Sequence, residues 1–387
     1  MNPWNINVIR NLSNLAGWKT SRKLLVLESD DWGSIRMPSR DVYESLIQAG
    51  FDLTSDDGAR FNKYDTLASY EDLSCLFEIL TSFKDQTGRP PVFTPVAVVA
   101  NPDFEKIIRS DFSHYFYEPF NLTLTRYSGC EKSFDLWLEG INKRLFVPQF
   151  HGREHLNVKI WLKTLKEGNE KTLTAFKNGM WGFSTTEVPE INAELQAAFD
   201  FIDTKDLIYH EEVIVTGLML FYQIFGYRAT YFVPPNGPFS SKLEPVCARE
   251  GIRYIATSKI QNEPLGQGRI KRNLHWIGQR NRNGLIYITR NCFFEPSQPG
   301  LDWVGNCLSD IAIAFKWGKP AVISTHRVNY IGSLYRINRE NGLKQLECLL
   351  KQIIKNWPDV EFISSAELGE IINNERFDLQ NNAQANS

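Results

Sequence analysis

Short apolar runs that alternate with helical patterns constrain the fold of this chain more than any other feature. Each run is rich in Val, Ile, Phe and Tyr, and the alternation is typical of parallel strands joined by helices. The expected strands span residues 23–27, 92–99, 145–150, 229–233, 254–257, 285–289, 321–324 and 361–363. We therefore expect an α/β fold, a distorted (β/α) barrel of about seven or eight parallel strands with loop and helix insertions.

Helical signals fill the gaps between these runs. Ser69 and Asp72 form a capping box, and the apolar spacing after them predicts a helix. Residues 211–225 have the composition of a buried helix, and residues 341–355 are amphipathic. Both of these helices precede an expected strand, as a β/α repeat requires.

Four segments lie outside the repeat and define the domain organisation. Residues 23–373 are the expected barrel, and residues 1–22 are an expected helical extension before it. Residues 374–387 are polar and rich in Asn and Gln, which predicts a disordered tail. The Asp-rich residues 50–65 and the aromatic-rich residues 111–140 are expected as insertions near the mouth of the barrel.

Composition excludes several classes of protein. The 43 basic and 45 acidic residues are spread evenly, so no nucleic-acid partner is indicated. The six cysteines form no C-x-x-C pair, which argues against a zinc knuckle or a disulfide framework. The N-terminal residues lack the continuous apolar core of a signal peptide, and the longest apolar run is too short to span a bilayer. A cytoplasmic location is expected, while the oligomeric state stays open.

Polar residues follow several of the expected strands. Asp30 and Asp31 come after the first one, where one carboxylate could bind a cation while the other acts as a base, or both could cap a turn. His151 and His155 are four residues apart, so that both imidazoles could reach one ion, although surface or core positions are equally compatible. His326 ends another strand, and a lone histidine is more often structural.

A turn after the strand at residues 229–233 completes the set. Pro234 and Pro235 make it rigid, and Gly237 can take a positive φ. Such a loop could place backbone N–H groups beside a bound carbonyl, or it could be an ordinary connection to the next helix.

Five pieces occur in one order along the chain: Asp30-Asp31, His151 with His155, Val233-Pro234-Pro235-Asn236-Gly237, Asp302-Trp303 and Ile323-Ser324-Thr325-His326. In this order they resemble the Asp-Asp, H-x-x-x-H, R-x-P turn, Asp-Trp and L-x-x-H motifs of the polysaccharide deacetylases of the NodB-homology type, a family of carbohydrate esterases. The resemblance runs from about residue 23 to about residue 371.

The resemblance implies one divalent metal ion, Zn²⁺ or another such as Co²⁺. Asp31, His151 and His155 would bind it and leave open positions, which is the pattern of a catalytic metal site. Asp30 would act as the base that removes a proton from the attacking water.

The resemblance also assigns the remaining motif residues. His326 would protonate the leaving group, and Asp302 would favour its charged form. Trp303 would form a wall of the acetyl pocket, while Pro235 and Asn236 would contact the substrate, with a backbone N–H sharing the oxyanion charge.

Two positions depart from the family pattern. Val233 stands where the family carries an arginine that orients the base. Either another arginine does this, with Arg153 and Arg290 as candidates that could also contact substrate, or the activity is weakened or lost. Gly152 stands where Ser or Thr usually follows the first histidine, so the ligand loop must be braced in another way.

The expected function is removal of an acetyl group, from nitrogen rather than oxygen, from a carbohydrate or carrier-linked saccharide. Two alternatives stay open. One is a metal-dependent glycosidase or amidohydrolase on a related barrel, since the same carboxylates and histidines would serve that chemistry. The other, motivated by Val233, is a catalytically degraded carbohydrate-binding protein.

Overall fold

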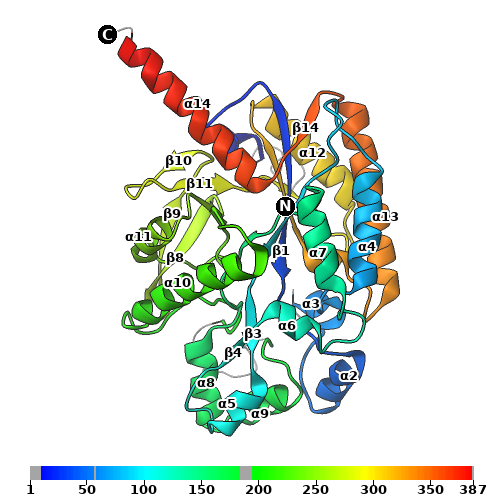
Figure 1. The fold of residues 1–387 in the computed structure, drawn as a ribbon, viewed down its shortest axis with the longest axis vertical. Coiled ribbons are helices and arrows are strands. Elements are labelled where there is room, and N and C mark those ends of the chain that lie inside the picture. The colour runs from blue at the N-terminus through cyan, green and yellow to red at the C-terminus, as the bar shows by residue number, and fades with distance from the viewer. Residues whose placement is uncertain (1–9, 56–57, 184–193, 386–387) are drawn as a thin grey trace.

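The computed structural model describes residues 10–55, 58–183 and 194–385, and its centre is one curled sheet (Figure 1). In spatial order its strands are β10 (Gln279–Arg280), β11 (Ile286–Thr289), β7 (Tyr254–Thr257), β6 (Tyr231–Phe232), β5 (Gln149–Phe150), β2 (Phe93–Ala97), β1 (Lys23–Trp32), β13 (Ala321–His326) and β12 (Cys292–Phe293). Strand β14 (Val360–Phe362) also pairs with β1. All neighbours from β11 to β12 are parallel, so the expected distorted (β/α) barrel is confirmed.

Strand β1 lies in the middle of the sheet because its sequence is apolar on both faces. Leu25 and Leu27 belong to the main core, which includes residues of the surrounding helices. Leu24 and Val26 alternate with them and pack on the other face of the sheet, with residues such as Val322. This double burial explains why the run is continuously apolar rather than alternating.

Helices surround the sheet: α2 (Arg40–Gln48), α3 (Ala59–Tyr64), α4 (Tyr70–Thr81), α5 (Phe104–Arg109), α6 (Phe120–Leu124), α7 (Ser133–Asn142), α8 (Val158–Lys166), α9 (Glu170–Lys177), α10 (Asp206–Phe225), α11 (Glu244–Arg249), α12 (Trp303–Lys316), α13 (Arg336–Asn356) and α14 (Ser365–Ala385). The expected capping box is present, since Ser69 accepts a hydrogen bond from the Asp72 N–H while the Asp72 carboxylate accepts one from the Ser69 N–H. Two short 3₁₀ helices are η2 (Ser241–Leu243) and η3 (Arg327–Tyr330).

Two small antiparallel hairpins were not expected from the sequence. They are β3 (Ala100–Pro102) with β4 (Tyr117–Pro119), and β8 (Ile260–Gly266) with β9 (Arg269–Leu274). Strand β9 is almost entirely exposed and carries several charges, so it lacks the apolar run by which the other strands were recognised.

The two expected insertions differ in where they lie. Residues 59–64 of the first form α3, which reaches the central cavity through Arg60 and Phe61. The second forms β4, α6 and α7, and it buries Leu124 and Trp137 in the main core. Helices α5, α8 and α9 pack together around a separate apolar cluster, at the end of the molecule opposite α14 (Figure 1).

Helix α14 includes residues 374–385, for which the sequence predicts a disordered tail. The Asn- and Gln-rich composition removes core contacts but does not forbid helical hydrogen bonds, and Leu368 and Ile372 bury the first turns of the helix. Of the expected extension at residues 1–22, residues 1–9 lie outside the described residues.

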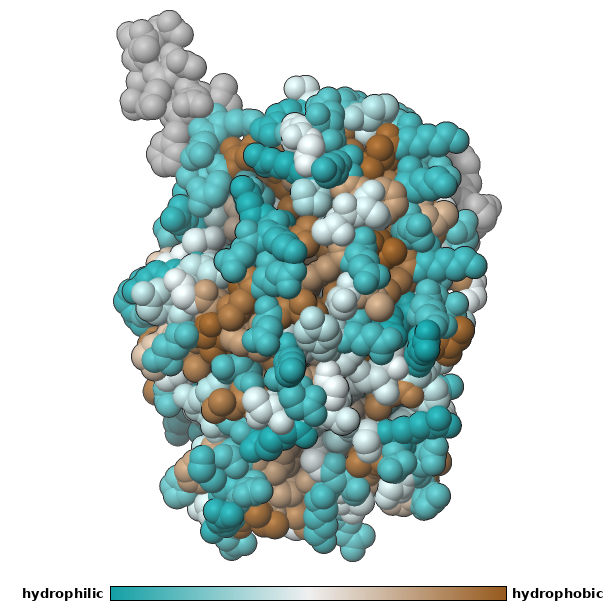
Figure 2. Space-filling model, turned by 45° about the vertical axis from the view of Figure 1, so that its right-hand side comes forward, coloured by the Kyte–Doolittle hydropathy of each residue, from teal (hydrophilic) through white to brown (hydrophobic). Residues whose placement is uncertain are grey.

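Polar side chains predominate on the face shown in Figure 2, with apolar patches exposed between them. Among the described residues, no helix combines the length and the apolar character needed to cross a membrane. All six cysteines are free thiols.

Candidate metal centre and its surroundings

A cavity of about 760 Å³ opens at the carboxyl ends of the parallel strands. This is the edge at which (β/α) barrels build their sites, because the side chains after neighbouring strands meet there. The cavity is lined by Asp30 and Asp31 near the end of β1, His151 and His155 after β5, and His326 at the end of β13. The structure therefore brings together residues that are up to about 300 positions apart in the chain.

A bulge in β1 turns both carboxylates toward the cavity. The register between β1 and β2 shifts between Ser29 and Trp32, and Asp31 has a φ of 73°. Successive side chains of a regular strand point to opposite faces, so one of the two Asp residues would otherwise face away. The positive φ is unfavourable for a residue other than glycine, which marks this turn as strained.

Asp31, His151 and His155 converge on one point, and their ligand atoms all lie within 4.8 Å of one another. The Asp31 Oδ1 atom is 3.0 Å from His155 Nε2 and 3.5 Å from His151 Nε2. Ligand atoms bound to a tetrahedral ion at 2.0–2.1 Å stand roughly 3.3 Å apart. All three residues are buried, so the donor set and its spacing fit a divalent metal ion.

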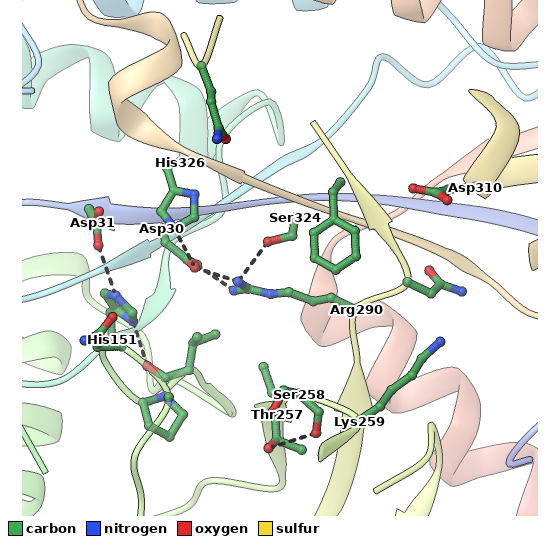
Figure 3. Close-up of a pocket in the computed structure, with 18 of the residues that line it drawn as sticks. Asp30, Asp31, His151, Thr257, Ser258, Lys259, Arg290, Asp310, Ser324 and His326 are labelled. Atoms are coloured by element: carbon green, nitrogen blue, oxygen red, sulfur yellow. Dashed lines mark hydrogen bonds and ion pairs between the residues drawn. The ribbon is translucent and has the colours of Figure 1, made fainter. Parts of the chain in front are cut away.

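The tautomer of His151 also fits this role. Its Nδ1 lies 2.7 Å from the Val233 carbonyl oxygen and donates to it, which leaves Nε2 unprotonated and facing the cluster (Figure 3). In the described structure His151 Nε2 has no hydrogen-bond partner although it is buried. A buried polar atom without a partner is costly, and a metal ion would satisfy it.

Burial and the neighbouring charges favour the ligand forms of these groups. Burial lowers the pKa of His155, and Asp31 opposes this only in part, so the imidazole is neutral at neutral pH. Burial alone would raise the pKa of Asp31, but the adjacent imidazoles of His151 and His155 outweigh it and hold that pKa well below its usual range. A neutral imidazole and an ionised carboxylate are the forms that bind metals.

The loop that carries the two histidines is braced through its backbone. The Arg153 carbonyl oxygen accepts hydrogen bonds from the backbone N–H groups of Val99 and Ala100, at 3.1 and 2.7 Å. Gly152 has a φ of 109°, and a Cβ there would lie 3.3 Å from Pro235 and 3.1 Å from the Glu154 carbonyl oxygen. Glycine therefore allows a close approach that a serine or threonine would prevent.

The arginine that contacts Asp30 is Arg290. The sequence alone leaves the choice between Arg153 and Arg290 open. The two terminal nitrogens of Arg290 each lie 2.5 Å from a carboxylate oxygen of Asp30 (Figure 3). Its Nε lies 2.5 Å from Glu28. Burial alone would raise the pKa of Asp30, but Arg290 outweighs burial and lowers it, so Asp30 is ionised. A bidentate pair also fixes the orientation of the carboxylate.

Arg153 instead lies behind the ligand loop. Only 3% of it is exposed, and it forms a bidentate ion pair with Glu154 and further hydrogen bonds to Thr216 and Tyr209. The expectation that Arg153 contacts substrate or Asp30 is therefore not met, because Arg153 does not line the cavity and its hydrogen bonds are made to Glu154, Thr216 and Tyr209.

His326 pairs with Glu295 and not with Asp302. The His326 Nδ1 to Glu295 Oε1 distance is 2.5 Å, and Nε2 lies 3.7 Å from Asp30. Burial alone would lower the pKa of His326, but Glu295, with a further contribution from Asp30, raises it to about 9. Arg60 in turn pairs with Glu295 at 2.7 Å, so the carboxylate is held from two sides.

Asp302 and Trp303 stand at the start of α12. The Asp302 side chain accepts a hydrogen bond from the Gly305 N–H and caps the helix, and the Trp303 indole donates to the Gln298 carbonyl oxygen. The prediction that Asp302 supports His326 is wrong, because Asp302 is used as a helix cap. Asn236, at a φ of 56°, does line the cavity, while Pro235 packs against Gly152.

Three residues for which the sequence predicts no role also line the cavity: Arg36, Phe61 and Gln196. Arg36 donates to Gln196 at 2.7 Å and its guanidinium lies 5.3 Å from the Phe61 ring centroid. None of these residues follows an expected strand, so position in the repeat could not have revealed them. The position of Glu295 could have identified it as a candidate, because Glu295, like Arg290, follows the expected strand at residues 285–289.

The fold and the site together define a (β/α) barrel protein with a buried carboxylate and histidine centre. No protein-family model and no curated protein matches this sequence. Among solved structures, the chain is similar to a Mycobacterium smegmatis protein provisionally assigned as a polysaccharide deacetylase, with 10% identity, 93% of this chain and 94% of that chain covered, and a TM-score of 0.43.

Two other solved structures have comparable similarity. The Puue allantoinase is 10% identical over 91% of each chain, with a TM-score of 0.46. A Pseudomonas aeruginosa PAO1 protein, described with reservation as a polysaccharide deacetylase, is 9% identical over 90% of this chain and 91% of that chain, also with a TM-score of 0.46.

Proposed function

We propose that this protein is a metal-dependent hydrolase that removes an acetyl group from a carbohydrate. The observation that carries the proposal is the convergence of three arrangements on one cavity. These are the triad of Asp31, His151 and His155, the pair of Asp30 with Arg290, and the pair of His326 with Glu295. Each arrangement begins with a motif residue, and through these motifs the sequence resembles the NodB-type deacetylases. The three residues are Asp31, Asp30 and His326.

The two carboxylates of β1 divide the work. Asp31 is the metal ligand, and a divalent ion held there would activate water and polarise the acetyl carbonyl. Asp30, oriented by Arg290, accepts a proton from the attacking water. The backbone N–H of Asn236 is a candidate donor to the carbonyl oxygen, because this loop lines the same cavity.

His326 supplies the proton for the leaving group. With a pKa of about 9 it is protonated at neutral pH, and it lies 3.7 Å from Asp30, on the opposite side of the base from Arg290 (Figure 3). An amine leaves poorly unless it is protonated, whereas an alcohol depends less on an acid. A protonated histidine therefore favours hydrolysis of an N-acetyl over an O-acetyl group.

Aromatic side chains support a sugar as the substrate. Phe61 and Phe293 line the cavity. Aromatic faces offer flat apolar surfaces on which a sugar ring can stack.

The direct test is acetate release after loading the purified protein with Zn²⁺ or Co²⁺. We expect acetate from an N-acetylated sugar, and loss of the activity on chelation. A released sugar without acetate would indicate the alternative glycosidase. Metal binding and sugar affinity with no hydrolysis of any acylated sugar would indicate a degraded binding protein, against which the pairing of Arg290 with Asp30 argues.

A further inference from the structure

The cavity continues past Arg290, away from the candidate metal centre (Figure 3). Lys259 and Asp310 lie at this far end, and Arg10 and Ser13 of the N-terminal segment line it as well. The volume of about 760 Å³ is that of a site for a whole small molecule rather than for an acetyl group alone. This end must therefore contact a part of the substrate distant from the reacting bond.

Lys259 is a half-buried cation whose hydrogen bonds are incomplete. Its Nζ donates to Ser13 Oγ at 2.9 Å, and among the described residues Lys259 forms no ion pair within 4.0 Å. An ammonium group has three donors, so two remain for another partner. Burial lowers the pKa of Lys259, and the neighbouring Cys292 and Asp310 oppose this only in part.

Lys319 has a structural role, and its hydrogen bonds can be compared with those of Lys259. The Lys319 Nζ donates to the carbonyl oxygens of Ala16, Gly17 and Trp18, at 2.8, 2.8 and 2.9 Å, so all three donors are used. Lys319 fixes the N-terminal segment to the barrel. Lys259 contacts the same segment but keeps its remaining donors directed to the cavity.

Charge at this end of the cavity is positive overall. Arg10 pairs with Asp310 through Nε at 3.0 Å, which leaves Lys259 as the second cation beside a single carboxylate. An unpaired cation in a partly buried site is unfavourable unless a ligand supplies the opposite charge. An oxyanion with several acceptor oxygens would satisfy both the charge and the unused donors.

We propose that the far end of the cavity is a subsite for an oxyanion, so that the preferred substrate is an acetylated sugar carrying a phosphoryl or carboxylate substituent. Lys259 is its principal contact and Arg10 is close enough in the same wall to assist. The inference rests on the proposed deacetylase function and specifies its substrate class.

The activity test compares three substrates. N-acetylglucosamine is neutral, N-acetylglucosamine 1-phosphate carries a phosphoryl group, and an N-acetylated hexosaminuronate carries a carboxylate. We expect Lys259→Gln to lower kcat/KM about 10- to 100-fold for a charged substrate, mainly through KM, and to leave the neutral sugar unchanged. Lys259→Arg should restore most of the loss. Which charged sugar is affected identifies the oxyanion.

Matched controls guard against a general effect of the substitution. Lys351→Gln removes an exposed lysine of α13 and should change nothing. Circular dichroism and the Tm of Lys259→Gln should equal those of the wild type. Equal kcat/KM for neutral and charged sugars in the wild type, or equal losses for both in Lys259→Gln, would overturn the inference.

A binding measurement separates this inference from the proposed function. N-acetylglucosamine 1-phosphate is titrated calorimetrically into the metal-loaded wild type and into metal-loaded Lys259→Gln. Any binding of the phosphate to the metal is the same in both proteins, so a difference in Kd reports on Lys259. A weaker Kd in the variant supports the subsite even if no acetate is released from any sugar. The same titration with the N-acetylated hexosaminuronate covers a carboxylate ligand, and equal Kd values in the two proteins for both charged sugars, or no binding of either to the wild type, refute the inference.

Discussion

Buried polar groups on the two sides of the cavity differ in whether they have partners within the protein. On the ligand side, the buried Nε2 of His151 has no partner among the described residues, and the backbone is strained at Asp31. On the proton-transfer side, charged groups pair fully with one another, as Asp30 does with Arg290. The first side is incomplete without an ion, whereas the second is complete as it stands.

Because of this difference, substitutions on the ligand side should act through metal binding, and substitutions on the proton-transfer side should act through proton transfer. Changes on the ligand side should remove the ion and with it all activity. Changes on the proton-transfer side should leave the ion bound and alter rates or pH dependence. The predictions below test this separation, beginning with the largest effect.

Replacement of the ligand carboxylate should have the largest effect. Asp31→Asn removes a charged ligand, so we expect loss of bound zinc and a decrease in kcat of about a thousandfold or more, since a metal contributes several kcal/mol to charge stabilisation. Elemental analysis measures the bound zinc, and acetate release measures kcat. Asp302→Asn is the control, because asparagine caps a helix as well as aspartate does and should retain both.

Replacement of the neighbouring carboxylate should separate chemistry from metal binding. Asp30→Asn is expected to lower kcat about 100- to 10,000-fold through loss of the base, while the zinc content stays that of the wild type. If Asp30→Asn loses the metal and Asp31→Asn keeps it, the two roles are exchanged.

Removal of the carboxylate behind the acid should change the pH profile. Glu295 raises the pKa of His326 to about 9, so activity should fall as pH rises through about 9, where His326 loses its proton. Glu295→Gln removes that support, and the alkaline limb of kcat against pH should move to lower pH. An unchanged alkaline limb would mean that His326 is not the group that titrates there.

The smallest effect tests the strain on the ligand side. Gly152→Ala forces a side chain into a position with a φ of 109° and close contacts to Pro235 and Glu154, and we expect it to lower the free energy of unfolding by about 1–3 kcal/mol. Gly237→Ala at a φ of 93° meets no atom within 4 Å, so its loss in urea unfolding should be smaller. Equal losses would show that backbone strain alone decides the cost.

The sequence predicted the barrel well because burial on both faces makes the parallel strands continuously apolar. It failed at elements that are largely exposed, such as strand β9. Residues 374–385, for which the sequence predicts a disordered tail, lie in α14, and the disorder stays a prediction.

Within the site, the sequence predicted the residues that end strands, such as Asp31 and His151, because their position follows from the repeat. It could not choose between Arg153 and Arg290, since the contact of Arg290 with Asp30 joins residues 260 positions apart. It also assigned the support of His326 to Asp302 when Glu295 provides it, because nearness in sequence says little about which carboxylate faces a given imidazole.

The position of Arg290 has a consequence for how relatives of this protein can be recognised. A guanidinium in contact with the base can enter the cavity from more than one strand, so it is a property of three-dimensional position and not of linear order. A linear pattern that demands arginine at position 233 rejects this chain. A spatial template built on the atoms of Asp30, Asp31, His151 and a guanidinium from any strand would accept it, together with any other protein in which this contact has changed its place in the chain.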